Sequence, residues 1–171
     1  LQFICSNDLS KLKPGKAQYN YMPNEKGGVV DDLIVYQLNT QKYLLVVNAS
    51  NIDKDWDHIQ KQNQKFNAIV TNQSENTALL AIQGPKALTA MQKLCDMDLH
   101  SLSNYSHQTT SFGGIKNVLV ATTGYTGAGG IEIYFDVQHA VSIWKAIIEA
   151  GNDFGILPIG LAARDTLRLE M

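Results

Sequence analysis

The stretch GGVVDDLIVY, residues 27–36, combines the composition of a β-strand with two adjacent acids. Valine, isoleucine and tyrosine are enriched in strands, whereas aspartate is depleted in them. An ionised carboxylate inside a protein is costly unless hydrogen bonds or an opposite charge satisfy it. Asp31 and Asp32 therefore require a structural or functional explanation.

Strand geometry separates these two acids. Because successive side chains of a strand point to opposite faces, Asp32 shares a face with Ile34 and Tyr36, and Asp31 lies on the other face. Two interpretations follow from the residues alone. Either both acids cap the turn next to Gly28, or one of them points into a cavity.

Strands and helices alternate at short intervals along the rest of the chain. Alternating hydrophobicity and turn residues predict strands at 17–22, 29–38, 42–48, 66–72, 77–83 and 131–136. Residues 109–123 predict a hairpin around Gly113 and Gly114. Amphipathic spacing predicts helices at 52–64, 84–94, 137–150 and from 161 onward, the first with Asn51 as its N-cap. We expect an α+β fold with antiparallel or mixed sheets and packed helices in two layers.

Length and charge limit the possible functions. A chain of 171 residues is long enough for one large domain or two small ones, and the polar stretch near 95–106 suggests sub-domains at 1–95 and 96–171. The formal net charge of −2 gives no basic field for nucleic acid or an anionic membrane surface. The sequence contains no run of about twenty apolar residues, so it predicts no membrane span.

Cysteine and histidine spacing predicts neither a redox pair nor a metal site. Cys5 and Cys95 form no C-x-x-C pair, which favours reduced, buried thiols in a cytoplasmic protein. The histidines have no metal-ligand spacing, and no Ser/His/Asp or Cys/His set can be assembled. The histidines are His58, His100, His107 and His139.

The stretch GIEIYFD repeats the question of an acid in a strand. Glu132 lies on the face opposite Ile131 and Ile133. It either points into water from a two-sided sheet or faces a pocket. In a pocket, its carboxylate could accept two parallel hydrogen bonds from a guanidine-like ring edge, such as the N–H and amino group of a pterin.

Two further motifs have more than one interpretation. The loop TGYTGAGG, residues 123–130, leads into a strand and lacks the phosphate-loop pattern, so a tight turn that presents Tyr125 is favoured over phosphate binding. In GLAARDTLRLE, residues 160–170, Arg164 and Arg168 share one helical face. A salt-bridged surface helix explains that spacing without any ligand.

Five stretches in this order resemble the folate-binding aminomethyltransferases, the T-protein family of the glycine cleavage system. They are GKAQYNYMPNEKGGVVDDLIVY, LLVVNASNIDKDW, ALLAIQGPKAL, TGYTGAGGIEIY and GLAARDTLRLE. The resemblance implies a folate-binding core with a ferredoxin-like sub-domain and a second sub-domain. It also implies that the family's N-terminal segment and C-terminal domain lie outside this chain, and that the chain alone is inactive.

The resemblance implies a one-carbon transfer in glycine catabolism. The partner H-protein would carry an aminomethyl group on its lipoyl arm. Tetrahydrofolate would be the acceptor substrate, and ammonia would be released. The family needs no metal for this step.

The resemblance also assigns roles to individual residues. Asp32 matches the catalytic aspartate, which would stay ionised beside the reacting nitrogens. The matching folate-binding positions are Glu132 at the pterin edge, Tyr125, Arg164, Tyr19, Tyr36 and Asn48. The chain departs from the family at Ala128, where an acidic residue is usual.

Two alternatives share this resemblance. One is the folate domain of a dimethylglycine- or sarcosine-oxidising enzyme. The other is a non-catalytic folate-binding relative that assists iron–sulfur maintenance, although its K-G-C-Y-type motif is missing from this sequence.

Overall fold

The structure, a computed structural model, describes residues 1–170, except for the side chains of Arg164, Leu167, Arg168 and Glu170. It divides the chain into two compact units, at Leu1–Ser74 and from Glu75 onward. This division falls earlier than the predicted boundary at 95/96. The reason is that strand β4 (Thr77–Gln83) pairs with strand β7 (Gly130–Asp136) and so belongs to the second unit.

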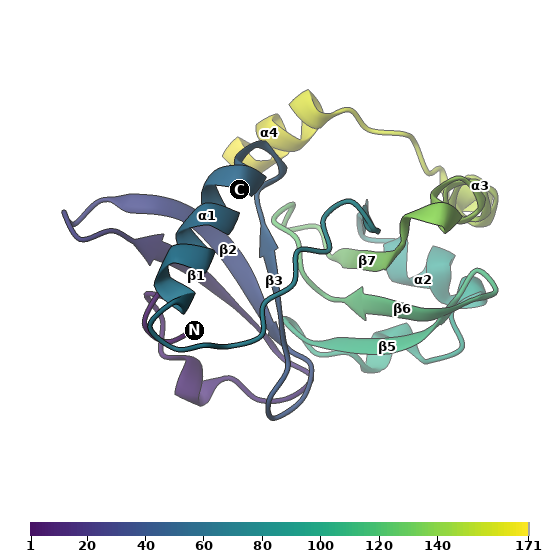
Figure 1. The fold of residues 1–171 in the computed structure, drawn as a ribbon. Helices are drawn as coiled ribbons and strands as arrows, with labels where there is room; N and C mark the ends of the chain where they lie inside the picture. Colours follow the sequence, from purple (N-terminus) through teal and green to yellow (C-terminus); the bar gives the residue numbers. More distant parts are fainter. Residues whose placement is uncertain (171) are drawn as a thin grey trace. The chain divides into compact units, whose positions relative to one another are not determined.

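The first unit is a three-stranded antiparallel sheet in the order β1-β2-β3, with one long helix (Figure 1). Its elements are η1 (Leu9–Lys11), β1 (Ala17–Pro23), β2 (Val29–Gln37), β3 (Tyr43–Val47), η2 (Ala49–Asn51) and α1 (Ile52–Asn63). The β1–β2 turn is closed by Asn24, whose side-chain oxygen accepts from the amides of Lys26 and Gly28, both at 2.9 Å. The turn is therefore held by Asn24 and not by the two acids.

The face of β2 that carries Leu33 and Val35 packs under helix α1. Both side chains are buried in one cluster with Met22 and with Ile59 of the helix. Asp32 lies on the opposite face, as the strand periodicity predicts. The two acids therefore belong to different faces of the same sheet.

The predicted strand at 66–72 is wrong. This segment follows α1 as an irregular extended stretch, and the side chain of Ile69 is 99% exposed. Asn67 has a left-handed φ of 54°, and Asn63 holds both the amide and the carbonyl of Ala68. The apolar run has no neighbouring strand to pair with, so its β-propensity is not realised.

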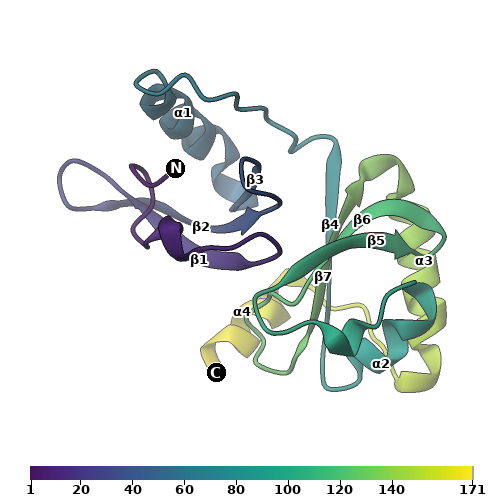
Figure 2. The same cartoon turned by 90° about the horizontal axis from the view of Figure 1, so that it is seen from below.

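The second unit is a four-stranded antiparallel sheet in the order β4-β7-β6-β5. Its further elements are α2 (Ala87–Met91), η3 (Gln92–Leu94), η4 (Leu99–Ser101), β5 (His107–Phe112), β6 (Ile115–Ala121), η5 (Val137–His139), α3 (Ala140–Gly151), η6 (Asn152–Phe154) and α4 (Leu161–Glu170). Helices α2 and α3 cover one face of this sheet (Figure 2), where Ile131, Ile133 and Phe135 meet Met91 and Ile147. The α+β prediction is confirmed.

Several local predictions agree with these elements. The hairpin of β5 and β6 turns at Gly113 and Gly114, which have φ of 57° and 79°. Asn51 stands at the N-cap of α1, but its side chain makes no capping hydrogen bond.

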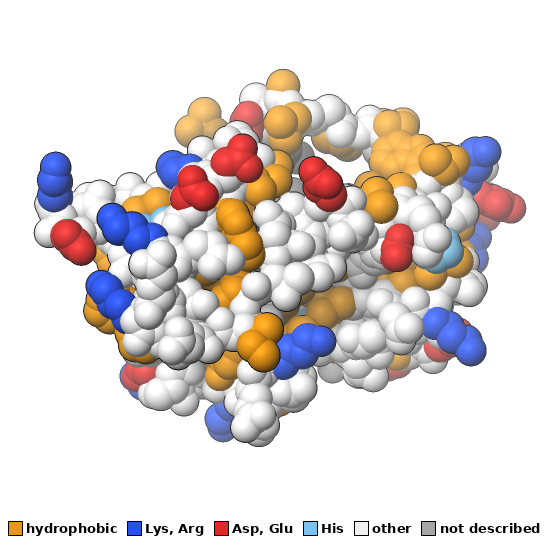
Figure 3. All heavy atoms as spheres, in the orientation of Figure 1, with side chains coloured by type: hydrophobic (Ala, Val, Ile, Leu, Met, Phe, Trp, Pro, Cys, Tyr) orange, Lys and Arg blue, Asp and Glu red, His pale blue; other side chains and the backbone are white. Residues whose placement is uncertain are grey.

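None of the helices in the described part of the chain is long and apolar enough to cross a bilayer. Acidic and basic side chains are interspersed on the face that Figure 3 displays.

Candidate functional site

The first candidate site is the acid pair of β2 and the asparagine that follows β3. The β2–β3 ladder ends at the pair Leu33 and Val47, so Asn48 is the next residue beside Asp32. The Asn48 amide nitrogen donates to Asp32 Oδ1 at 2.5 Å and to Asp31 Oδ1 at 3.1 Å. A single side-chain amide therefore links carboxylates that leave the strand on opposite faces.

Tyr19 supplies the second donor to Asp32. Tyr19 pairs with Ile34 across β1 and β2, which places it on the same face as Asp32 and diagonally next to it. Its hydroxyl donates to Asp32 Oδ2 at 2.7 Å. Asp32 itself is half-buried, and Tyr19 and Tyr21 on this face are 45% and 46% exposed. The Asp32 carboxylate is thus oriented at both oxygens while its face retains exposed aromatic surface.

Asp31 is held on the helix side of the sheet. It accepts hydrogen bonds from the Asn51 side chain at 2.8 Å and from the Asp32 amide at 2.9 Å, in addition to the one from Asn48. Burial alone would raise the pKa of Asp31. The hydrogen bonds from Asn51, the Asp32 amide and Asn48 outweigh that effect, so its pKa lies below the usual value.

Asn48 and Asn51 occupy N-cap positions, but their side chains do not cap the helices. Asn48 and Asn51 stand at the N-cap positions of η2 and α1, where an asparagine side chain normally accepts from a free helical amide. Neither of them makes a capping hydrogen bond, and both amide groups donate to the acids of β2 instead. The start of α1 is therefore built to hold carboxylates.

Asp55 is a third acid at this place, and sequence reasoning did not single it out. It lies in the first turn of α1 and is completely buried. Burial, together with the negative charge of the nearby Asp31, raises the pKa of Asp55 to about 7. Neither carboxyl oxygen of Asp55 has a hydrogen-bond partner among the described residues. An acid in a first helical turn is common at protein surfaces, so its sequence position gave no signal of burial.

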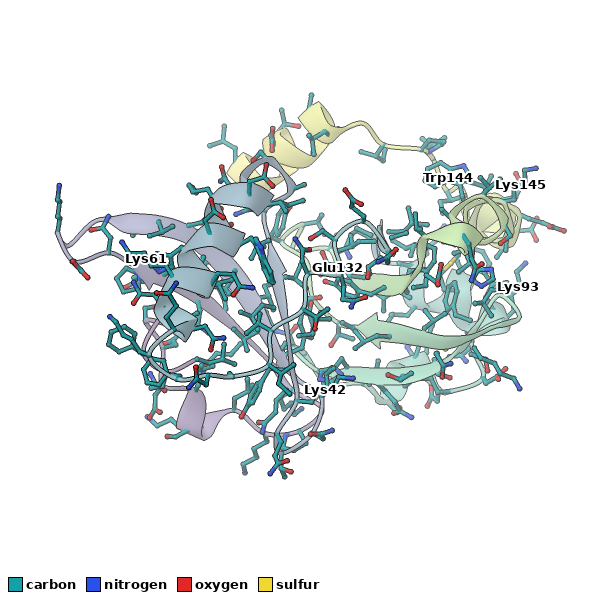
Figure 4. The ribbon with its side chains drawn as sticks, in the orientation of Figure 1. Lys42, Lys61, Lys93, Glu132, Trp144 and Lys145 are labelled. Carbon is teal, nitrogen blue, oxygen red and sulfur yellow. The ribbon has the colours of Figure 1, made fainter. Side chains whose placement is uncertain are left out.

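The second candidate site surrounds Glu132 on β7 (Figure 4). Glu132 is only 8% exposed, so it does not point freely into water. The hydroxyls of Thr123 and Tyr134 both donate to Glu132 Oε2, the latter at 3.3 Å. Among the side chains that the structure describes, no lysine or arginine forms an ion pair with it. Glu132 is therefore held by neutral donors, as Asp32 is.

A cavity of about 390 Å³ adjoins this site where β4 ends and β7 begins. Thr123 lines the cavity and also donates to Glu132, so it connects the two. The remaining lining residues are Gln83, Leu88, Asn104, Tyr105, Thr122, Gly124, Gly127, Gly129 and Gly130. Most of the residues that line the cavity are therefore glycines or residues with polar side chains.

Hydrogen bonds of Gln83, the last residue of β4, join the glycine-rich loop at residues 123–130 to that strand. The Thr126 hydroxyl donates to Gln83 Oε1 at 3.1 Å, and Gln83 Nε2 donates to the Ile131 carbonyl at the same distance. Gly130 has a φ of 138°, and a Cβ there would lie 2.3 Å from the Ile82 carbonyl oxygen. Only glycine fits this junction. Tyr125 projects from the loop with 38% of its surface exposed.

The structure brings only some of the predicted site residues together. Tyr19, Asp32 and Asn48 are joined by hydrogen bonds in the first unit. Glu132 and the loop that carries Tyr125 belong to the second unit, and the side chain of Arg164 lies outside the described residues. Tyr36 is on the predicted strand but has no exposed surface.

Sequence reasoning also missed the donors to these carboxylates. Asn51, Thr123 and Tyr134 lie in the quoted motifs, but nothing in their spacing identifies their acceptors. Within the described residues, no group of three or more His, Cys, Asp or Glu side chains is arranged to hold a metal ion.

The fold and these sites define a class of α+β domain in which two antiparallel sheets each hold a carboxylate with neutral hydrogen-bond donors. The chain belongs to the GCVT N-terminal domain family, whose model matches residues 1–171. The predicted family resemblance is thereby confirmed.

Individual relatives agree with this assignment. The aminomethyltransferase of Bacteroides fragilis is 56% identical over 171 residues, which are 100% of this chain and 47% of that protein. The aminomethyltransferase of Deinococcus deserti is 47% identical over 170 residues, which are 99% of this chain and 46% of that protein. The chain thus spans about half the length of the curated relatives it matches.

Solved structures match as well. The glycine cleavage system aminomethyltransferase T from Bartonella henselae has a TM-score of 0.84 and 29% identity, over 99% of this chain and 44% of that one. The heterotetrameric sarcosine oxidase from Corynebacterium sp. U-96 has a TM-score of 0.62 and 22% identity, over 87% of this chain and 71% of that one. The second match concerns the fold alone.

Proposed function

We propose that the protein to which this chain belongs is the tetrahydrofolate-dependent aminomethyltransferase of a glycine cleavage system. The family assignment and the names of the relatives support this function. The observation that carries it is the half-buried Asp32 carboxylate, held at both oxygens by Tyr19 and Asn48 on a face with exposed aromatic surface.

The proposed reaction transfers one carbon from an aminomethyl-lipoyl H-protein to tetrahydrofolate. The methylene carbon gains bonds to two folate nitrogens and loses its bonds to sulfur and to the amino nitrogen. Ammonia, dihydrolipoyl H-protein and 5,10-methylenetetrahydrofolate are the products. This scheme balances without an oxidant or a reductant.

Asp32 is the proposed catalytic residue. Neutral donors orient its carboxylate without cancelling the negative charge, so the charge remains available to stabilise positive charge that develops on the reacting nitrogens. A group fixed before the reaction needs little reorganisation during it. Tyr19 and Asn48 are therefore proposed to position Asp32 and to border the folate.

Glu132 is proposed to bind the pterin edge. Its carboxylate is largely buried and is held by hydroxyls, so its charge is available for a ligand that presents two parallel N–H donors. Tyr125, exposed on the adjoining loop, is proposed to line the pterin wall. Arg164 remains a folate-binding candidate from the family resemblance. Tyr36 is less favoured, because a ligand could reach its buried ring only if neighbouring side chains moved.

Ammonia release tests the proposed function. The complete protein is mixed with aminomethylated H-protein and tetrahydrofolate, and each is omitted in turn. We expect ammonia only when both are present. Folate binding without ammonia release would instead support the non-catalytic folate-binding relative. The cytoplasmic location and the inactivity of residues 1–171 alone stay predictions, the latter testable in the same assay.

A further inference from the structure

The side chain of Gln83, the last residue of β4, makes contacts that the proposed reaction does not use. Its amide group lies where β4 ends and β7 begins, beside the glycine-rich loop at residues 123–130, and all of these belong to the second unit. The side chain is half-buried, and both its nitrogen and its oxygen form hydrogen bonds. The groups that it contacts surround the backbone of Glu132.

We propose that Gln83 is a positioning residue, whose side-chain amide holds the main chain of both Glu132 and its hydroxyl donor and thereby orients the Glu132 carboxylate toward the bound pterin. This proposal deepens the proposed function and rests on it for the role of Glu132. Gln83 does not act on the reacting atoms, so its effect is on the affinity for tetrahydrofolate and not on the chemical step.

The nitrogen of the Gln83 amide connects the acid with its donor. Nε2 donates to the Ile131 carbonyl at 3.1 Å, and that carbonyl belongs to the same peptide group as the Glu132 amide. Nε2 also donates to the Thr123 carbonyl at 3.4 Å, and the Thr123 hydroxyl donates to Glu132 Oε2. A side-chain amide has two N–H donors, so one Gln83 nitrogen holds both backbone segments.

The ladder between β6 and β7 does not extend to Thr123. It ends at the pair Ala121 and Glu132, two residues before Thr123. The Thr123 side chain is nevertheless only 4% exposed. The hydrogen bond from Gln83 therefore ties Thr123 to β4, on the far side of β7, where the strand ladder no longer holds it.

The oxygen of the same amide holds the loop that carries Tyr125. Gln83 Oε1 accepts from the hydroxyl of Thr126, the residue after Tyr125, at 3.1 Å. The Gly84 amide donates to the Gly129 carbonyl at 2.8 Å, which joins the loop to the end of β4 at a second point. The carboxylate and the loop thus share one anchor.

Two glycines of the loop make room for the Gln83 side chain. A Cβ at Gly124 would lie 2.7 Å from Gln83 Oε1, and a Cβ at Gly130 would lie 3.0 Å from Gln83 Cδ. The two glycines have φ of 131° and 138°, which other residues rarely adopt. The loop backbone therefore lies directly against the amide and leaves it little freedom to move.

Two variants of the complete protein give the first test. Gln83→Met keeps the length of the side chain and removes its hydrogen bonds, and Gln108→Met makes the same change at an exposed position of β5 in the same sheet. We expect Gln83→Met to weaken tetrahydrofolate binding about 5- to 10-fold in calorimetric titration, on the scale of one or two hydrogen bonds. Gln108→Met should bind as wild type does.

The kinetic constants provide a second readout. Because the proposed role concerns binding, KM for tetrahydrofolate should rise in Gln83→Met while kcat at saturating folate stays within about threefold of wild type. A fall in kcat with an unchanged KM would overturn the proposal. Unchanged affinity for tetrahydrofolate would overturn it as well.

A double-mutant cycle asks whether Gln83 acts through the carboxylate. In the Glu132→Gln background, Gln83→Met should weaken binding only about twofold, because the charge that Gln83 orients is gone. Thr126→Val removes the loop contact alone and should give a loss of the same small size. Equal losses from Gln83→Met in both backgrounds would show that Gln83 serves only the fold.

Carboxyl ¹³C spectra of protein labelled at glutamate Cδ separate this proposal from the proposed function. The Glu132 resonance, identified by its loss in Glu132→Gln, should shift in Gln83→Met without any folate and stay in place in Gln108→Met. An unmoved resonance would overturn the proposal. If the wild type does not bind tetrahydrofolate, the proposed function is refuted, and the spectra still report whether Gln83 positions Glu132.

A second substitution covers the case in which Gln83→Met does not fold. Gln83→Asn keeps the amide but shortens the side chain by one methylene, which takes its nitrogen out of reach of the Thr123 and Ile131 carbonyls together. The same loss of affinity and the same shift of the Glu132 resonance are expected. Wild-type values for both would overturn the proposal.

Discussion

The two units hold their carboxylates in different ways. In the first unit, the donors to Asp31 and Asp32 are largely amides from the segment between β3 and α1. In the second unit, the donors to Glu132 are hydroxyls beside it, Tyr134 on β7 itself and Thr123 just after β6. The comparison teaches that the first site depends on the docking of a helix, whereas the second is part of the sheet.

Asp32→Asn in the complete protein is expected to have the largest effect. The variant keeps the shape but removes the charge that the proposed reaction needs, so kcat should fall about 10²-fold or more. Asp31→Asn is the matched control, because the same change on the opposite strand face should cost much less. Steady-state ammonia release measures both, and equal losses would reject the separation of faces.

The pH dependence of the free energy of unfolding should distinguish the site of the first unit, which depends on the docking of α1, from the site around Glu132. The folded-state pKa of Asp55 is about 7, above its unfolded value of about 3.8, so the folded state holds the extra proton between these two values. The contribution of Asp55 to stability is therefore greatest at low pH and is lost as pH rises from about 4 through 7.

The measurement compares urea unfolding of wild type and Asp55→Asn at several pH values. The variant should gain stability relative to wild type by a few kcal/mol between pH 4 and pH 8. If the difference in unfolding free energy between the two proteins did not change with pH, Asp55 would not be the residue that holds the extra proton.

Glu132→Gln tests the candidate site of the second unit, in which the donors to the carboxylate lie on or next to the sheet. Loss of a charged acceptor in a largely buried position should weaken tetrahydrofolate binding by about 10- to 100-fold, equivalent to about 1.5–3 kcal/mol. Calorimetric titration of the complete protein measures this affinity. Unchanged affinity would show that Glu132 serves only the sheet.

Tyr19→Phe should give the smallest effect. It removes one hydroxyl donor from Asp32 at a partly exposed position, so we expect kcat to fall about 5- to 10-fold, near the lower end for a hydrogen bond to a charged group. Tyr21→Phe is the control, because Tyr21 has nearly the same exposure on the same face. A loss of the same size in both variants would assign the effect to the aromatic surface.

Local patterns predicted most of the fold. The two-residue period of β2 separated Asp31 from Asp32, and the glycine pair marked the β5–β6 turn. The error at 66–72 arose because β-propensity needs a neighbouring strand, which an isolated segment does not reveal. The division at Ser74 depends on the pairing of β4 with β7, a contact between residues far apart in the sequence.

The candidate site was less predictable than the fold. The family resemblance and the strand period identified Asp32, and its partners Tyr19 and Asn48 were among the expected residues. Asp55 was not, because an acid in the first turn of an amphipathic helix looks like a solvated residue. Its burial accompanies the packing of α1 against the sheet, a contact that no local pattern encodes.

The strand pairings also set an order of assembly during translation. The sheet of the first unit joins consecutive strands and has all its partners once Val47 has left the ribosome. In the second unit, β4 has no partner until β7 has been synthesised, through Asp136. Because such distant pairing closes a long loop before it gains contacts, we expect it to form slowly. The nascent chain therefore exposes an unpaired β4 for much of its synthesis, and this is the interval in which a chaperone would matter most.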